Sequence, residues 1–195
     1  MDDVLSTLKG LRFKEGGFQE DLQTKLMELA QKRQKPKSDL EVYAELSKTD
    51  PDLAAIAMIE SSGGKNYKHT MDPKSKMTAG GMFGMMPYTA HDVVRWDKNV
   101  AEKYPEMADL TKDYKSNHSK ITEFFNNNPE AAVEFARSLY NRNKSKLGGD
   151  PEKAALSWFR GLSGAMRTSP EELNAHDYVQ KFRKYRNPIK IAKED

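Results

Sequence analysis

The residue best suited to chemistry in this sequence is Glu60, a lone acid that follows the apolar run Ile56–Ile59. It stands seven positions after Leu53 and four after Ile56, a spacing that places its carboxyl on the core-facing side of a helix. Gly63 and Gly64 end that helix, so the carboxyl lies near unpaired carbonyl groups at the negative end of the helix dipole. Burial and the dipole both disfavour the carboxylate, which predicts a raised pKa and a general acid. A helix-end glutamate that faces solvent is the alternative.

The segment after Glu60 changes character along its length. It is polar from Asn66 to Pro73, then apolar with three glycines from Gly80 to Pro87. Glycine lets a backbone approach a ligand closely, but no Gly-Lys-Ser/Thr element is present, which argues against a phosphate-binding loop. The four histidines show no metal-ligand spacing, so we expect neither a metal site nor a cofactor; they are His69, His91, His118 and His176.

Two motifs resemble those of the lytic transglycosylases of the soluble, goose-type lysozyme-like group. Glu60-Ser61 is similar to the Glu-Ser pair that ends a helix in that family. Residues 81–90, Gly-Met-Phe-Gly-Met-Met-Pro-Tyr-Thr-Ala, resemble the family segment Gly-Leu-Met-Gln-x-Met-Pro-x-Thr-Ala, with Gly84 in place of Gln. Counted back from this motif, Ser75 falls where the family often has a substrate-contacting serine.

A third element is more degenerate. Ala155–Gly161 resembles Ala-x-x-Tyr-Asn-Ala-Gly, with Trp158 and Phe159 at the Tyr and Asn positions. Tyr178-Val179 is similar to the family's closing Tyr-Val helix. The resemblance covers residues 38–186 and implies an all-α, lysozyme-like domain.

The resemblance also implies an activity. The family cleaves the β-1,4 bond between N-acetylmuramic acid and N-acetylglucosamine in peptidoglycan, which makes Glu60 the general acid and then the base. The muramoyl 6-hydroxyl would attack, so the products would carry 1,6-anhydro ends. Substrate contacts are expected from Ser61, Ser75, Met82, Phe83, Gly84, Met85, Tyr88, Trp158, Phe159 and Tyr178. Aromatic and methionine side chains suit the apolar faces of sugars, although core packing would also explain them.

Two other readings stay open. An inverting muramidase needs a second acid to activate water, and Asp72 is the nearby candidate. Asp72 precedes Pro73, an arrangement that is common in turns where the carboxylate only caps the backbone. The degenerate third motif also fits a catalytically inactive, lysozyme-like module that binds the cell wall.

Helix-start signals predict the elements that position these residues. Four sites combine an N-cap acceptor, a proline at the first helical position and an acid; they are Asp50-Pro51-Asp52, Asn128-Pro129-Glu130, Asp150-Pro151-Glu152 and Ser169-Pro170-Glu171. Ser38 and Glu41 have capping-box spacing. Apolar spacing adds one helix after Pro87 that extends to Val100, and a short one around Ile121. The fold class is all-α, with room for a small β-hairpin between residues 64 and 82.

Domain organisation and composition limit the partners. We expect an N-terminal helical extension with a basic linker at 1–37, the main domain at 38–187 and a tail at 188–195. The 195 residues include 31% charged residues and no cysteine, with a net charge of +3. Zero cysteines exclude disulfides and thiolate metal sites, and the mild positive charge is weak evidence for nucleic acid, so we expect no nucleic-acid partner.

No apolar run reaches transmembrane length, and the acidic start Met1-Asp2-Asp3 does not resemble a signal peptide. The expectation is a monomer that is made in the cytoplasm and acts on periplasmic peptidoglycan glycan strands. Delivery in a phage virion, by a phage lysis system or by a secretion apparatus would bring it to the wall.

Overall fold

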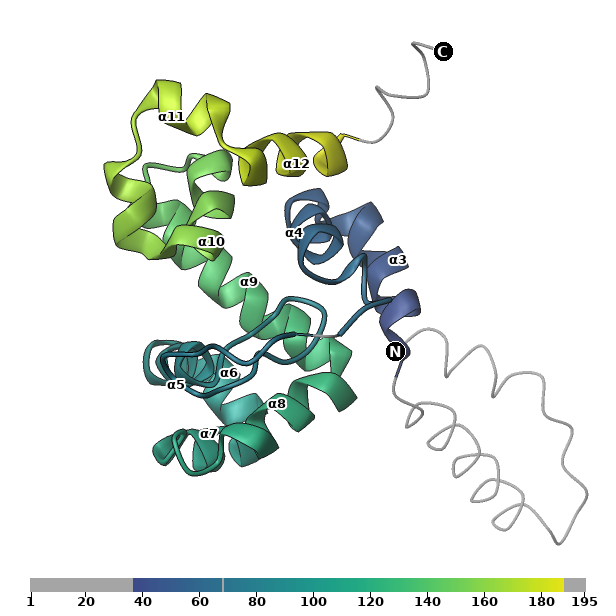
Figure 1. The fold of residues 1–195 in the computed structure, drawn as a ribbon. Helices are drawn as coiled ribbons and strands as arrows, with labels where there is room; N and C mark the ends of the chain where they lie inside the picture. The colour runs from purple at the N-terminus through teal and green to yellow at the C-terminus, as the bar shows by residue number, and fades with distance from the viewer. Residues whose placement is uncertain (1–36, 68, 188–195) are drawn as a thin grey trace, which may run out of the picture. The chain divides into compact units, whose positions relative to one another are not determined.

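The computed structural model describes residues 37–67 and 69–187, which form ten α-helices and no β-strand (Figure 1). The all-α fold class is therefore confirmed for this part of the chain. The chain divides into two units, Met1–Pro36 and Lys37–Asp195. The helices expected before residue 37 and the tail at 188–195 lie outside the described residues.

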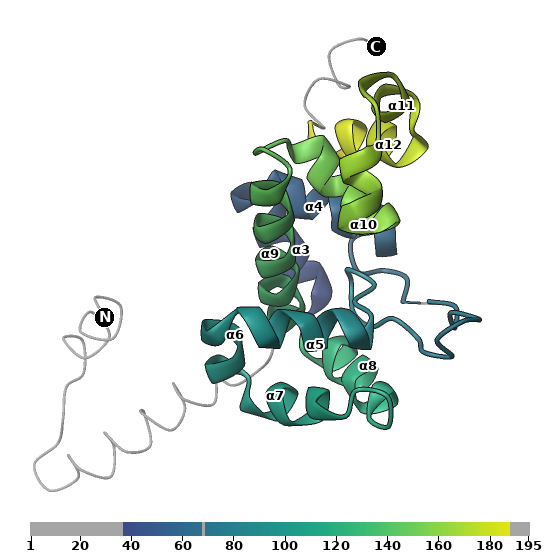
Figure 2. The ribbon, with the colours of Figure 1, turned by 90° about the vertical axis from the view of Figure 1, so that its left-hand side faces the viewer.

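Short connections join the ten helices in chain order, except for the long segment between α4 and α5. They are α3 (Asp39–Thr49), α4 (Pro51–Ser61), α5 (Pro87–Trp96), α6 (Lys98–Lys103), α7 (Pro105–Lys112), α8 (His118–Asn127), α9 (Pro129–Lys146), α10 (Pro151–Arg167), α11 (Pro170–Ala175) and α12 (Asp177–Arg186). In both views α9 runs from the group α5–α8 to the group α10–α12, with α3 and α4 alongside (Figures 1 and 2).

The proline-marked helix starts are confirmed at all four sites. Asp50, Asp150 and Ser169 each accept a hydrogen bond from a backbone N–H of the first helical turn. Ser38 also forms the expected capping box with Glu41. The cap expected at Asn128 is wrong, because its side-chain amide instead donates to the carbonyl oxygen of Phe124 at 2.8 Å.

Two stretches that the apolar spacing joined are each split into two helices. The stretch after Pro87 breaks at Asp97, whose carboxylate caps α6 by accepting from the N–H of Val100. The stretch after Pro170 breaks at His176, whose Nδ1 accepts from the N–H of Tyr178 and so caps α12. Side chains that hydrogen-bond the local backbone compete with helix continuation. Helix α7, which begins at Pro105, was not predicted.

The hairpin expected between residues 64 and 82 is wrong. Within the described residues this region has no strand, and one isolated bridge pairs Gly80 with Met85. Asp72 and Met77 form a tight turn instead, in which the N–H of Asp72 donates to Met77 O at 2.8 Å. The polar residues therefore bend the chain before two extended runs can pair.

Helix α4 is buried on all sides, which differs from the single core-facing stripe expected from its spacing. Every residue from Leu53 to Ala57 is buried. Helices α3, α9, α10 and α12 all contact it, and its alanines allow close approach from several directions. The last turn of this central helix carries Glu60.

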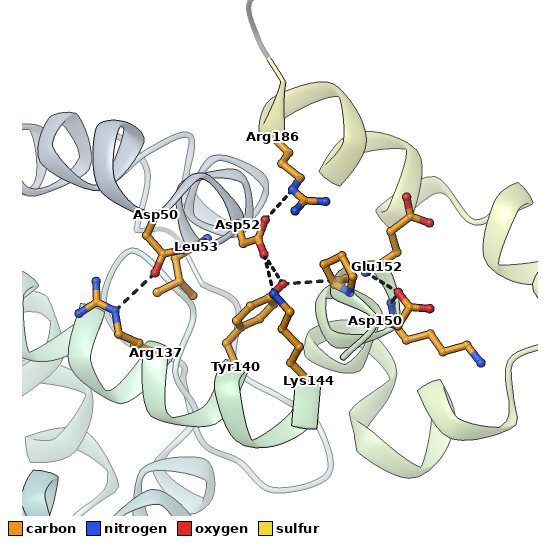
Figure 3. Close-up of polar contacts among 11 residues, drawn as sticks. Asp50, Asp52, Leu53, Arg137, Tyr140, Lys144, Asp150, Glu152 and Arg186 are labelled. Carbon is orange, nitrogen blue, oxygen red and sulfur yellow. Dashed lines mark hydrogen bonds and ion pairs between the residues drawn. The ribbon is translucent and has the colours of Figure 1, made fainter. Parts of the chain in front are cut away.

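Helix α12 runs antiparallel to α4 and is attached to it at both ends. At one end, Arg186 Nε lies 2.6 Å from Oδ1 of the buried Asp52, in the first turn of α4 (Figure 3). Asp52 Oδ2 also accepts from Tyr140 Oη at 2.7 Å and lies 3.4 Å from Lys144 Nζ, both on α9. At the other end, Tyr178 of α12 reaches Glu60. These contacts fix the position of the helix end that carries the acid.

Candidate active site

Glu60 lies partly buried in the last turn of α4 and is held by a tyrosine. Tyr178 Oη donates to Glu60 Oε1 at 2.7 Å. Burial raises the pKa of the Glu60 carboxyl, while the hydrogen bond from Tyr178 and the charge of His69 act in the opposite direction. The net direction is the one expected from the sequence. Burial and the neighbouring Glu60 also raise the pKa of Tyr178 well above its usual value, so the phenol keeps the proton that it donates.

The backbone at Gly84 passes directly beside this carboxyl. Gly84 has a φ of +60°, and a Cβ there would lie 3.3 Å from Glu60 Oε2 and 3.2 Å from His69 Cε1. A glycine fits because it tolerates the left-handed backbone and leaves room for both neighbours. At this position, where the motif that the segment resembles has Gln, an added side chain would meet the acid.

The His69 ring also lies beside Gly84. Its Nε2 lies 2.9 Å from the carbonyl oxygen of Gly81. A carbonyl only accepts, so Nε2 carries a hydrogen and donates it to Gly81 O. The sequence suggested only a surface or capping histidine here, and no spacing signal could have found it, because the loop that brings it back to Glu60 has no regular period.

A cleft of about 470 Å³ opens beside Glu60. This Glu60 cleft is lined by Glu60, Gly84, Met85, Met86, Tyr88, Thr89, Asp92, Trp96, Leu139, Arg142, Asn143, Lys146, Ser157, Trp158, Phe159, Gly161 and Leu162. Six of the predicted site residues therefore come together there: Glu60, Gly84, Met85, Tyr88, Trp158 and Phe159.

Aromatic side chains form much of the wall near the acid. Trp158 Nε1 donates to the carbonyl oxygen of Phe83 at 2.9 Å, which fixes the indole against the glycine-rich segment. Phe159 is 66% exposed and stacks on Tyr178 with 5.8 Å between ring centroids. Helix α10 is interrupted just beyond, at Gly161, whose φ of 70° and ψ of 165° are not helical. The wall thus offers flat apolar faces next to a carboxyl.

Other predicted site residues lie beneath the cleft. Met82 and Phe83 are fully buried. Ser61 is also buried, and its hydroxyl donates to Met82 O at 2.7 Å and accepts from the N–H of Gly64 at 2.9 Å. Their placement favours a supporting role, in which Ser61 joins the end of α4 to the glycine-rich segment. Direct contact of these three residues with a substrate stays a prediction.

The remaining two predicted residues, Ser75 and Asp72, bond to each other outside the Glu60 cleft lining. The Asp72 carboxylate accepts from Ser75 Oγ at 2.6 Å, from the N–H of Ser75 at 3.1 Å and from the N–H of Lys74 at 3.2 Å. The hydrogen bond from Ser75 is the largest cause that holds the pKa of Asp72 below its usual range. The turn therefore uses Asp72 as a backbone cap.

The lining residues that the sequence reasoning missed include Trp96 and every charged residue other than Glu60; these charged residues are Asp92, Arg142 and Lys146. They come from α5 and α9, which are separated in the chain by the whole of α6–α8. Asp92 is exposed and is the other carboxylate of the lining. Trp96 fits the apolar spacing of its helix, so only the three-dimensional packing could place it at a cleft.

Compared with models of known protein families, with curated proteins and with solved structures, the chain matches none of them. Across residues 37–67 and 69–187, no helix is long and apolar enough to cross a membrane. In the same described part of the chain, no three His, Asp or Glu side chains converge as metal ligands.

Proposed function

We propose that this protein is a peptidoglycan lytic transglycosylase with a lysozyme-like fold, and that its reaction takes place in the Glu60 cleft. The bond cut is the β-1,4 linkage between N-acetylmuramic acid and N-acetylglucosamine. The observation that carries the proposal is the state of Glu60, a carboxyl whose pKa is raised by burial and which opens onto a cleft with aromatic walls. An acid that holds its proton toward neutral pH can protonate a leaving oxygen.

In the proposed reaction, Glu60 gives its proton to the glycosidic oxygen as the bond from that oxygen to C1 of the muramoyl sugar breaks. The oxocarbenium-like centre at C1 is then attacked by the 6-hydroxyl of the same sugar. The Glu60 carboxylate takes the proton of that hydroxyl and returns to its starting state. Tyr178 holds the carboxyl in one orientation throughout, and Phe159 and Trp158 offer faces for sugar rings.

The hydrogen bonds of Asp72 favour this reaction over an inverting hydrolysis that uses Asp72 as the second acid. An inverting enzyme needs a second carboxylate free to activate water, typically about 6.5–9.5 Å from the acid. Asp72 is engaged by three hydrogen bonds in its own turn and does not line the Glu60 cleft. The intramolecular 6-hydroxyl removes the need for such a group.

Digestion of purified peptidoglycan, with mass analysis of the released fragments, tests the proposal. Wild-type protein should release 1,6-anhydro muropeptides, and Glu60→Gln should release none while it melts at the wild-type temperature or above. Asp72→Asn and Asp92→Asn are matched controls that also replace a carboxylate by its amide, and both should keep most of the activity. Reducing-end products that disappear in Asp72→Asn would show a hydrolase. Wall binding without cleavage by the wild type would show an inactive wall-binding module.

A further inference from the structure

Arg142 stacks on an indole and has no ion-pair partner in the described part of the chain. Its guanidinium carbon lies 3.5 Å from the ring centroid of Trp96. The indole is itself oriented by Ser138, whose Oγ accepts from Trp96 Nε1 at 3.4 Å. Within the described residues, Arg142 forms no salt bridge, whereas four other arginines pair with a carboxylate; these are Arg137, Arg160, Arg183 and Arg186.

The Trp96–Arg142 stack stands where two hollows meet. Both residues line the Glu60 cleft, and both also line a neighbouring hollow of about 570 Å³ between α5, α6 and α9. Lys146, one turn further along α9, is a second exposed cation in the lining of the Glu60 cleft and likewise has no salt bridge among the described residues. A polymer that extends beyond the Glu60 cleft along this surface would therefore pass two unpaired cations.

The geometry of Arg142 suits one kind of ligand. A guanidinium that lies flat on an aromatic ring uses its face for the stack and keeps the N–H groups on its edge available. Those donors match the two oxygens of a carboxylate, and Lys146 adds a mobile point charge. Asp92, also in the lining, acts against an anion. The two cations outweigh it, and the fork geometry of Arg142 selects a planar anionic group.

We propose that Trp96, Arg142 and Lys146 form a subsite that binds a carboxylate carried by the glycan chain being cleaved. This inference rests on the proposed function and names a substituent that the protein recognises away from the bond it cuts. Two sources supply that chemistry on peptidoglycan: the lactyl carboxylate of an unsubstituted muramoyl sugar, and the free carboxylates of the peptide attached to it.

Calorimetric titration of the full-length Glu60→Gln protein with defined glycan oligomers tests the subsite. Three oligomers of equal length are needed: one with free lactyl carboxylates, one with the lactyl groups converted to simple amides, and one that carries peptides with free carboxylates. We expect the protein to bind at least one carboxylate-bearing oligomer about tenfold more tightly than the amide oligomer. In the amide oligomer, the charge-assisted hydrogen bond between Arg142 and a carboxylate is replaced by a weaker bond to a neutral amide. The oligomer that shows the preference identifies the source.

Adding Arg142→Gln to this protein should remove most of that preference, and adding Asp92→Asn should increase it. The matched control is Arg95→Gln, because Arg95 is an exposed arginine on α5 outside both hollows. It removes the same charge, and the preference should persist. Equal melting temperatures exclude misfolding as the cause.

Any of three results would overturn the subsite. Arg142→Gln could weaken the binding of all three oligomers equally, the protein could show no preference for a carboxylate before that change, or it could bind none of the oligomers. Wall cleavage by the wild-type protein is measured separately. It shows whether the proposed transglycosylase function holds even where the subsite is overturned.

Discussion

At the scale of single residues, the proposed chemistry depends on opposed effects on the pKa of one carboxyl. Burial raises the pKa of Glu60, and the hydrogen bond from Tyr178 together with the charge of His69 limits that rise. Tyr178 therefore has two effects: its hydrogen bond fixes the orientation of the Glu60 carboxyl, and it limits the rise of the pKa by stabilising the carboxylate. The protonated form is the one that starts the proposed reaction, so activity should fall as the pH rises through the pKa of Glu60.

Tyr178→Phe should separate these effects. Loss of the hydrogen bond that favours the carboxylate raises the pKa of Glu60 further, so the alkaline limb of the kcat/KM profile should move to higher pH. The maximum rate should fall about 10-fold or more, since the carboxyl loses its orientation. The matched control is Tyr185→Phe, which removes the same hydroxyl from a more exposed tyrosine of the same helix. An alkaline limb that stays in place or moves to lower pH would contradict this account of Glu60.

At the scale of elements, the segment between α4 and α5 shapes the site through its backbone. Ser61 ties its glycine-rich part to the end of α4, and Trp158 ties the same part to α10. Gly84 follows these two attachments directly, and a Cβ added there would meet the acid. The helices hold Glu60 in place, and the irregular segment between α4 and α5 forms the rest of the site.

Gly84→Ala should therefore impair activity more than stability. The added Cβ meets Glu60 and His69, and displacement of a catalytic group by about 1 Å can cost about 100-fold in rate. Gly149→Ala is the matched control, because Gly149 has a φ of +84° and nothing within 4 Å of an added Cβ. Both variants should lose about 1 kcal/mol of stability from the left-handed backbone. Similar wall-cleavage rates for the two variants would show that Gly84 does not shape the site.

At the scale of the whole described domain, α4 is held at both ends by α12, and the Asp52 cluster forms the attachment farther from the site. Tyr140, Lys144 and Arg186 converge on this one buried carboxylate from α9 and α12 (Figure 3). The cluster closes the bundle around α4 and so keeps Tyr178 in register with Glu60.

Tyr140→Phe removes one hydrogen bond to this carboxylate without creating a cavity. It should lower the free energy of unfolding by about 1.5–3 kcal/mol, the range for hydrogen bonds to charged groups. Urea denaturation measures the change, and Tyr185→Phe serves as a control that should cost little. A Tyr140→Phe protein as stable as the wild type would show that Asp52 is held by its cations alone.

A chain that begins at Lys37 should fold, and it should cleave walls at the same rate as the full chain if the proposed activity is present. The division of the chain between Pro36 and Lys37 supports this cut. Lys37 is kept because its Nζ lies 2.7 Å from Glu45 Oε2 and 3.4 Å from Glu130 Oε1. Circular dichroism melting and digestion of purified walls provide the readouts. A truncated protein that is unfolded would place the first 36 residues in the core.

Local signals in the sequence determined the class of fold and the starts of its helices. An N-cap side chain acts on backbone groups two or three residues away, so motifs such as Asp50-Pro51 and Ser38 with Glu41 could be read without the fold. Apolar spacing alone gave the wrong helix ends at two places. Asp97 and His176 each cap a new helix within a stretch that the spacing would continue as one helix. Glu60 was identified because its helix is apolar and ends just beyond it.

Only the tertiary structure decided what surrounds Glu60. Tyr178 is 118 positions away and His69 lies in a segment without a period, so no local pattern could pair either with the acid. Trp96 and Arg142 meet only because α5 packs across α9. Contacts between residues so far apart in the chain depend on how the helices pack. Many different sequences satisfy the same requirements of shape and burial, so the sequence pattern alone does not specify which residues meet. The acid could thus be found from its own helix, and the family resemblance pointed to wall residues such as Tyr88 and Trp158. The hydrogen bond from Tyr178, the place of His69 and the stack of Arg142 on Trp96 required the fold.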